Sequence, residues 1–381
     1  MAILSFVNRM GTMVLPFLSV YLSTVRGFTL QETGLIASAF GFGSFAGAWL
    51  GGKVINWVGP LWVIKGSMFL GGVFLVSIQW ANGFYSTYTL IFMASIFGEA
   101  YRPALMTALS GYVPPTETGR SMSLIRLAIN LGFTAAPAIG GFVAATIGYQ
   151  WLFWIDGSTC LLAAFYFHWA TTKYKYNTNA AQKDNQTSHI TPPPYRNRLY
   201  LLFLLAAVFG GFTFMQWFQS VPVFIKTVWQ YDERYIGLLM ALSSVVIIIF
   251  EMPAIHYLEQ QNLKGKALLA GLALMAGGFL ILLFPASYLT GIAMMLVFTF
   301  GEALYLPLVN TLAINTSPVS RKGDYMAWYW MAWSVVNIIA PTAGLTIASV
   351  AGFSVFWMGL AGTTGISMVL MWIYMRKQQF Q

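Results

Sequence analysis

The sequence predicts an all-α membrane protein with twelve transmembrane helices in two pseudo-symmetric six-helix bundles. The 381 residues are 58% hydrophobic and only 8% charged, whereas an ordinary soluble domain is about 25% charged. Apolar runs of roughly 20 residues, the length that crosses a bilayer, recur along the chain. The tetrapeptide Phe-Gly-Glu-Ala at 97–100 recurs at 300–303, and Gly-Leu at 34–35 recurs at 237–238. Both repeats share an offset of 203 residues, which indicates two related halves.

Polar breaks separate the apolar runs into twelve expected spans. They are 2–22, 34–55, 61–81, 86–110, 121–144, 149–170, 199–225, 235–258, 266–285, 288–314, 324–348 and 353–375. The first is interpreted as a spanning helix and not a signal peptide, because it has no basic start and no cleavage site. The longest polar interruption divides the spans six and six. The expected domains are therefore an N-terminal bundle at 1–170, a linker at 171–198 and a C-terminal bundle at 199–381.

Positive charges fall mostly on one side of the expected spans. Alternating spans place these on one side: Lys53, Lys65, Arg120, Lys173, Lys175, Lys183, Arg196, Arg198, Lys264, Lys266, Arg321, Lys322, Arg376 and Lys377. Only Arg26, Lys226 and Arg234 fall on the other. Because Lys and Arg are enriched in cytoplasmic loops, both termini and the linker are expected in the cytoplasm. This asymmetry accounts for most of the net charge of +9.

The sequence lacks the motifs that several other classes of protein function require. The sequence lacks the basic patch interleaved with aromatics that nucleic-acid binding requires. It also lacks the phosphate-binding Gly-x4-Gly-Lys-Ser/Thr loop of an ATP-driven pump. No clustered nucleophile and base indicates an enzyme. Cys160 is the single cysteine, so no intramolecular disulfide can form. We expect no cofactor, no metal and no nucleic-acid partner.

Duplicated halves of membrane helices, with a site between them, are typical of secondary transporters. With a linker between two six-helix halves, the whole chain resembles the major facilitator superfamily. The loop after the second span has the family's glycine pair, Gly51-Gly52. However, Asn56, Trp57 and Pro60 stand where the family has Asp, Arg and Arg. The resemblance therefore implies a tight turn here without its usual charged residues.

The fifth span and its surroundings resemble the proton-coupled drug-efflux branch of that superfamily. Residues 132–141 are similar to its antiporter motif, Gly-x-x-x-Gly-Pro-x-x-Gly-Gly, and they include Pro137, Gly140 and Gly141. Small residues allow helices to approach closely, and proline permits a bend. The segment serves either generic tight packing or a gating bend that favours export. Residues 8–22 and 102–132 also look like this branch.

Two glutamates at the repeated motif are the first candidates for proton coupling. Glu302 lies mid-span with no cation one turn away. Since burial disfavours the charged form of a carboxyl, we expect Glu302 to carry protons; the alternative is a permanently protonated packing residue. Glu99 has Arg102 at i+3, where helical side chains meet. This pair is either static or breaks during transport.

Other ionisable residues fall within or near the spans. A charge at the helix centre costs at least about 2.5–3.5 kcal/mol, so each needs a partner, a proton or water. Asp156 and Glu251 are further coupling candidates, or gate and packing residues. Arg126, with Asn130 one turn on, pairs with Glu99 or binds an anionic substrate. Arg9 either snorkels to the interface or takes part in gating or binding.

Aromatic residues are frequent in the seventh, tenth and eleventh spans. Tryptophan and tyrosine usually belong to lipid-interface belts. An aromatic, Met-rich cavity with few polar groups would also suit amphipathic compounds. The candidates for cavity lining are Gln216, Trp217, Tyr305 and Trp330.

The leading hypothesis is a proton-coupled exporter of small amphipathic molecules that works by alternating access. The alternatives are a proton-coupled uptake symporter for a small metabolite or peptide, and a lipid translocase. The expected partners are a small-molecule substrate, protons and the lipid bilayer. The expected form is a monomer in a bacterial inner membrane.

Overall fold

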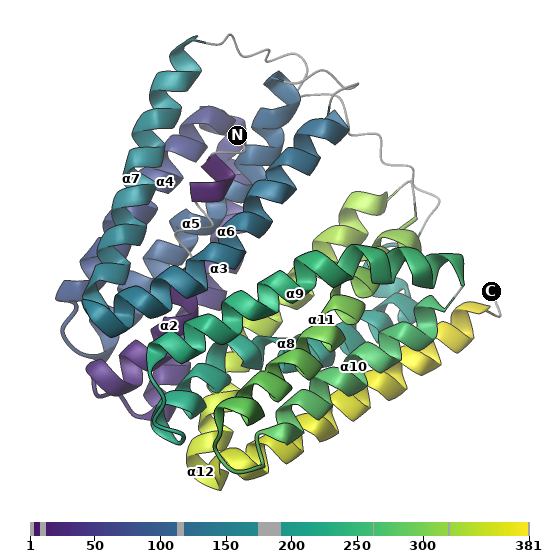
Figure 1. Cartoon of the computed structure of the whole chain (residues 1–381). Coiled ribbons are helices and arrows are strands. Elements are labelled where there is room, and N and C mark those ends of the chain that lie inside the picture. Colours follow the sequence, from purple (N-terminus) through teal and green to yellow (C-terminus); the bar gives the residue numbers. More distant parts are fainter. Residues whose placement is uncertain are drawn as a thin grey trace. The chain divides into compact units, whose positions relative to one another are not determined.

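The computed structural model describes residues 4–7, 13–112, 118–173, 192–261, 263–318 and 321–379. Within these ranges the regular structure is helical and contains no strand. The chain divides into two compact units (Figure 1). Unit 1 comprises Met1–Asp184 with Gln230–Leu238, and unit 2 comprises Asn185–Trp229 with Leu239–Gln381. The helix that begins at Glu233 therefore has its first turns in unit 1 and the rest in unit 2.

Unit 1 contains the helices from α2 to α7. Their bounds are α2 Val14–Val20 with the π-helix η1 Tyr21–Val25, α3 Leu30–Val58, α4 Pro60–Ser77 with the short 3₁₀ helix η2 Ile78–Trp80, α5 Phe84–Tyr112, α6 Thr118–Thr146 and α7 Gln150–Lys173. Helix α5 packs against α3 and α4, and α4 also packs against α7. These contacts place α5, with its repeated Phe-Gly-Glu-Ala motif, inside the bundle.

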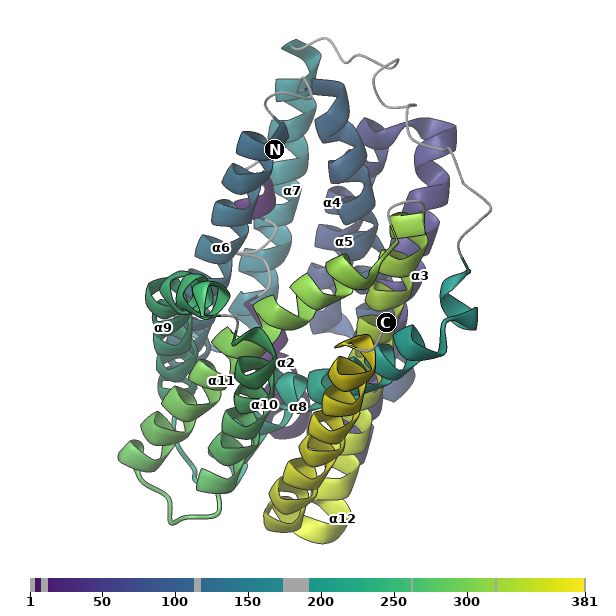
Figure 2. The ribbon, with the colours of Figure 1, turned by 90° about the vertical axis from the view of Figure 1, so that its right-hand side faces the viewer.

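Unit 2 contains most of α9 and the other helices from α8 to α12. Their bounds are η5 Pro194–Arg196, α8 Arg198–Thr227, α9 Glu233–Gln260, α10 Lys264–Ile281, α11 Tyr288–Thr316 and α12 Lys322–Gln379. Helix α12 packs against α8 and α10, and α10 packs against α11 (Figure 2). At Gly352 the backbone φ is 83°, a conformation that glycine adopts at little cost. The 58-residue α12 is therefore two successive helices joined at Gly352.

Helix starts recur between the halves at the offset of 203 residues seen in the sequence or one residue beyond it. Helices begin at residues 30, 60 and 84 and again at 233, 264 and 288. Helices likewise begin at 118 and 150, and again at 322 and just after Gly352. The predicted fold class of an all-α membrane protein with two related six-helix halves is confirmed.

Local sequence signals explain several of these helix starts. The Thr29 side chain accepts a hydrogen bond from the Glu32 N–H, and Glu32 accepts one from the Thr29 N–H, which forms a capping box at α3. Asn197 accepts from the Tyr200 N–H at α8, and Ser287 from the Thr290 N–H at α11. Such caps satisfy backbone donors that the first helical turn leaves free.

The first expected span, 2–22, is described in part. Residues 4–7 are helical, residues 8–12 lie outside the described part, and α2 begins at Val14. After α2 the chain widens into a π turn, in which the Arg26 N–H donates to the Tyr21 carbonyl oxygen at 3.0 Å. Periodicity does not distinguish an α turn from a π turn, so the sequence did not indicate this change.

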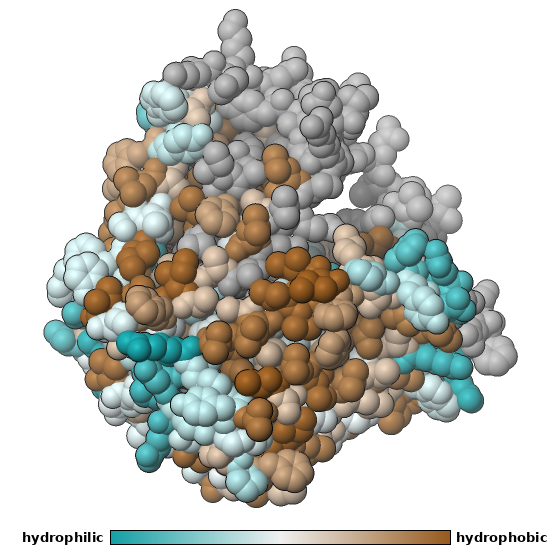
Figure 3. Space-filling view, viewed as in Figure 1, coloured by the Kyte–Doolittle hydropathy of each residue, from teal (hydrophilic) through white to brown (hydrophobic). Residues whose placement is uncertain are grey.

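The surface is strongly apolar where a bilayer would contact it. Seven helices in the described part are long and apolar enough to cross a membrane. Helix α9 exposes residues such as Ile248, Ile249 and Met252, and apolar side chains cover it in the view of Figure 3. A soluble protein rarely exposes so large a contiguous apolar patch.

Candidate functional site

The tight contact between α10 and α11 fixes the position of Glu302. A Cβ atom placed on Gly301 would lie 2.6 Å from the Gly271 carbonyl oxygen and 2.7 Å from the Met275 nitrogen. Only a residue without a side chain permits this approach. Glu302, the next residue, is thereby held inside unit 2 with 8% of its surface exposed.

Glu302 is a buried carboxyl with an incomplete set of partners. Its Oε2 has no hydrogen-bond partner among the described residues, and no Lys or Arg forms an ion pair with it there. Its electrostatic neighbour is Glu251 on α9. One turn further along α11 the fully buried Tyr305 occupies the position where a cation would stand. Two neighbouring carboxyls of this kind resist being charged together.

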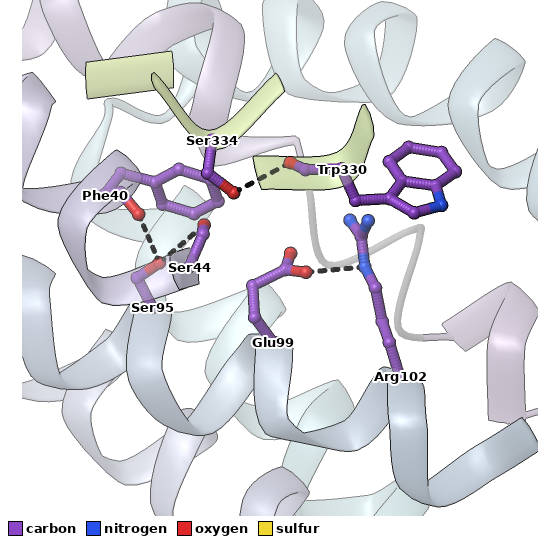
Figure 4. Close-up of polar contacts among 7 residues, drawn as sticks. All are labelled: Phe40, Ser44, Ser95, Glu99, Arg102, Trp330 and Ser334. Carbon is purple, nitrogen blue, oxygen red and sulfur yellow. Dashed lines mark hydrogen bonds and ion pairs between the residues drawn. The ribbon is translucent and has the colours of Figure 1, made fainter. Parts of the chain in front are cut away.

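The repeat-related Glu99 has a different environment in unit 1. The Arg102 Nε lies 2.6 Å from the Glu99 Oε2, and the two side chains are 48% and 14% exposed (Figure 4). The predicted i,i+3 pair is therefore present. One turn before Glu99, the Ser95 hydroxyl donates to the Phe40 carbonyl oxygen at 2.7 Å and contacts the Ser44 hydroxyl at 3.1 Å. These contacts hold α5 against α3.

Unit 2 has a similar hydroxyl contact near Glu302. The Thr299 hydroxyl donates to the Ser243 hydroxyl at 2.8 Å and joins α11 to α9. In both halves, a buried polar contact therefore ties the helix that carries the glutamate to its neighbour. The difference between the halves lies in the glutamate's own partner, which is an arginine in unit 1 and a second carboxyl in unit 2.

Asp156 on α7 is completely buried in unit 1. Its Oδ2 accepts a hydrogen bond from the Val14 N–H at 3.1 Å, at the first residue of α2. Its Oδ1 has no partner among the described residues. Asp156 therefore positions the start of α2, and its assignment as a coupling residue stays a prediction.

The expected substrate-binding residues of unit 2 differ in exposure. The Gln216 Nε2 donates to the Ala340 carbonyl oxygen at 3.0 Å, and its Oε1 accepts from the Ser220 hydroxyl at 2.6 Å. Trp217 is 2% exposed, and its ring centroid lies 5.5 Å from that of Phe298. Gln216 and Trp217 thus pack within the unit.

Trp330 differs from these packed residues because it is 56% exposed. The Ser334 hydroxyl donates to its carbonyl oxygen at 3.2 Å (Figure 4). The indole is therefore accessible to a ligand or to lipid. Among the aromatic residues predicted to line a cavity, Trp330 is the most exposed, whereas Tyr305 is fully buried.

The antiporter-like segment of α6 makes very close contacts. A Cβ on Gly140 would lie 3.1 Å from the Met13 Cβ, and one on Gly141 would lie 2.9 Å from the Gly237 Cα. These contacts, together with the buried Pro137, allow α6 to pack against α2 and the first turns of α9. The structure thus gives these residues a packing role, and gating stays a prediction.

Three predicted residues are not described in enough detail to locate. Arg9 lies outside the described ranges, and the side chains of Arg126 and Asn130 on α6 are not described. No group of three or more metal-binding side chains occurs within the described ranges.

Sequence reasoning missed a buried contact between Tyr149 and Glu233. The Tyr149 hydroxyl donates to the Glu233 Oε1 at 2.6 Å, and both residues are less than 9% exposed. The two residues are 84 positions apart, so no local pattern links them. The only available signal was the acidic first turn of α9, which reads as an ordinary helix start.

Comparison with known proteins identifies the class. The model of the Major Facilitator Superfamily matches residues 1–341 and also residues 230–380. The chain belongs to the Major Facilitator Superfamily and is an integral membrane transporter, not an enzyme. The fold and the duplicated helices agree with secondary transport.

The relatives are distant but cover nearly the whole chain. An uncharacterized MFS-type transporter of Methanocaldococcus jannaschii is 20% identical, over 92% of this chain and 91% of that protein. A Na(+), Li(+), K(+)/H(+) antiporter of Planococcus maritimus is 21% identical, over 92% and 88%. The crystal structure of the POT family transporter PepTSo has a TM-score of 0.79 at 14% identity and covers 99% of this chain and 97% of that one.

Proposed function

We propose that this transporter is a proton-coupled exporter of small amphipathic molecules, with Glu302 as the proton carrier. The observation that carries the proposal is the buried Glu302, which has a second carboxyl as its electrostatic neighbour and no described cation partner. A buried carboxylate without a partner is costly, whereas its protonated form is tolerated. The free-energy cost of keeping the Glu302 side chain buried therefore changes whenever it gains or loses a proton.

The Glu251–Glu302 pair gives this proton a physical role. We propose that the two carboxyls share one proton, because two like charges that interact resist being ionised together. When the site faces the side with more protons, a proton enters the pair and substrate leaves. When the site faces the other side, the proton leaves and substrate binds. A transport cycle built on this exchange is an antiport.

Two observations favour export over uptake. The α6 segment around Pro137 resembles the antiporter motif, and a relative that spans most of the chain is named a cation/proton antiporter. The exposed indole of Trp330 suits an amphipathic substrate. We further propose a monomer in a bacterial inner membrane, with bundles at 1–170 and 199–381 and a cytoplasmic linker at 171–198.

Everted membrane vesicles test coupling and direction together. Vesicles acidified inside by respiration are given ethidium, and acridine orange reports the lumenal pH. Antiport predicts proton release from the lumen when ethidium is added. The variant Glu302→Gln should abolish this release, because glutamine cannot exchange a proton, while downhill ethidium exchange persists. Glu302→Asp should retain release with a shifted pH optimum.

Two controls define the outcomes. Glu32→Gln makes the same substitution at an exposed capping residue that glutamine can replace, and it should behave like wild type. Glu251→Gln should change the pH dependence of release without abolishing it. Proton release by Glu302→Gln at the wild-type rate would contradict the assignment. Substrate-driven proton entry into intact cells would instead support symport.

A further inference from the structure

Unit 1 contains a cavity far along the chain from the proposed proton site. It has a volume of about 400 Å³, and its lining includes Tyr21, Arg26, Gln79, Tyr149 and Gln150. Small-molecule sites typically occupy about 300–1,000 Å³ and combine aromatic surface with a few polar groups. The cavity lies at the ends of α2, α4 and α7 opposite Lys173, from which the chain continues to the linker.

The backbone around the cavity departs from regular helix at two places. The π turn at Tyr21–Val25 forms one wall and carries Arg26 immediately after it. Single π turns inside helices are frequent at functional sites. The opposite corner turns at Gly148, where φ is 101° and the N–H donates to the Val143 carbonyl oxygen at 3.1 Å. This conformation strongly favours glycine.

Arg26 carries a positive charge that no described carboxylate neutralises. The Tyr21 hydroxyl is its electrostatic neighbour, and none of the ion pairs in the described part of the chain includes it. A guanidinium has five N–H donors in a planar fork, so donors remain for a ligand. An arginine in this arrangement suits bidentate binding of a carboxylate.

Two uncharged tyrosines form part of the cavity lining, with 5% of Tyr21 and 8% of Tyr149 exposed. The ring centroids of Tyr21 and Tyr149 lie 5.9 Å apart. A tyrosine phenol is uncharged at physiological pH. The Glu233 carboxylate is buried and accepts the Tyr149 hydrogen bond. Glu233 and Asp232 act electrostatically on Tyr149, and neither is among the residues that line the cavity.

We propose that this cavity binds small amphipathic organic anions, with Arg26 holding the carboxylate and the exposed Val25 side chain, together with the edges of the two tyrosine rings, contacting the apolar body. Gln79 and Gln150 supply amide groups at the rim. The proposal is independent of Glu302, because the site lies wholly in unit 1. In the topology proposed above it opens to the outside of the cell.

Binding of 1-naphthoate to the purified full-length protein tests the proposal. Naphthoate fluorescence should show saturable binding, whereas the neutral 1-naphthalenemethanol should bind more weakly. Arg26→Gln should weaken naphthoate binding by roughly tenfold or more, as expected for the loss of a charge-assisted hydrogen bond. The matched control is Arg234→Gln, which removes an exposed arginine that does not line the cavity. It should bind naphthoate like wild type.

A labelling experiment provides a second measurement of ligand binding in a protein that keeps Arg26. Gln150 is exposed at the cavity, whereas the native Cys160 is buried. Maleimide should label Gln150→Cys selectively, and naphthoate should slow this reaction while naphthalenemethanol does not. Equal binding of naphthoate by wild type and Arg26→Gln would overturn the proposal. So would tighter binding of 1-naphthylmethylammonium, or displacement of naphthoate by low concentrations of phosphatidylglycerol, which would identify a lipid headgroup site.

Discussion

At the scale of single residues, one neighbour separates the two repeated glutamates. Glu99 has Arg102 at i+3, and Glu302 has Tyr305 at the corresponding position. Arg102 gives Glu99 a cationic partner, whereas the buried Tyr305 offers no positive charge. A duplicated position has therefore diverged into an ion pair in unit 1 and a buried carboxyl without a described cation partner in unit 2.

The Glu99–Arg102 pair is expected to contribute modestly to stability. Arg102 is nearly half exposed and Glu99 is mostly buried, so its contribution lies between those of surface and buried pairs. Arg102→Ala should lower the free energy of unfolding by about 1 kcal/mol, because it leaves Glu99 without its cation. The double variant Glu99→Gln/Arg102→Ala should recover part of this loss. Thermal unfolding in detergent of both single variants and the double variant measures the coupling.

A transport measurement distinguishes a static pair from a moving one. If the pair is static, Arg102→Ala protein that remains folded should still drive uphill ethidium transport. If Arg102→Ala folds with unchanged stability and loses transport, the pair breaks during the cycle, and the stability argument above is wrong.

The sequence was sufficient to identify Glu302, Glu99 and Arg102 as candidates, but not to identify their neighbours in space. The depth of Glu302 and the i,i+3 spacing of Glu99 and Arg102 follow from position along a helix. The proximity of Glu251 to Glu302 depends on the packing of α9 against α11, and the two are 51 residues apart in the chain. Arg26 appeared only as one of three cations on the sparsely charged side, because a cavity is not a local property of sequence.

At the scale of helices, glycine decides how closely neighbours approach. Gly301 contacts the backbone of α10, whereas a Cβ on the repeat-related Gly98 would meet no atom within 4 Å. The same motif therefore has a strict steric requirement in unit 2 and a relaxed one in unit 1.

This contrast predicts different outcomes for the same substitution. Gly301→Ala should destabilise the protein by about 1–3 kcal/mol, because the methyl group overlaps backbone atoms that cannot easily move. Gly98→Ala should be neutral or slightly stabilising, since alanine favours helix. Thermal unfolding of the two variants in detergent makes the comparison. Equal loss of stability in both would show that the contact at Gly301 does not limit packing.

At the scale of the whole molecule, the repeat was the most informative feature of the sequence. Two short matches gave the offset of 203, and helix starts recur at that offset or one residue beyond it. Hydropathy separated the last two spans between 348 and 353, where the chain turns at Gly352. It did not indicate the π turn at Tyr21–Val25, because it reports length and polarity but not backbone geometry. The assignment of the first turns of α9 to unit 1 also depends on packing.

Charge at the helix ends predicts the orientation of the transporter. Lys53, Lys65 and Arg376 each lie over a tryptophan ring, at 3.9, 4.9 and 4.1 Å from its centroid. Such cation–aromatic pairs suit a membrane interface. All three occur on the side of the predicted spans that carries most of the Lys and Arg, which is expected to be cytoplasmic.

Thiol labelling in whole cells tests this orientation. The native Cys160 is buried, so an introduced cysteine dominates labelling. Ala286→Cys lies in the exposed loop between α10 and α11, and a membrane-impermeant maleimide should label it in intact bacterial host cells. Asn185→Cys, in the predicted linker, should react only after the cells are lysed. The opposite pattern would place the linker outside, and the direction of proton flow in the proposed antiport cycle would then have to be reversed.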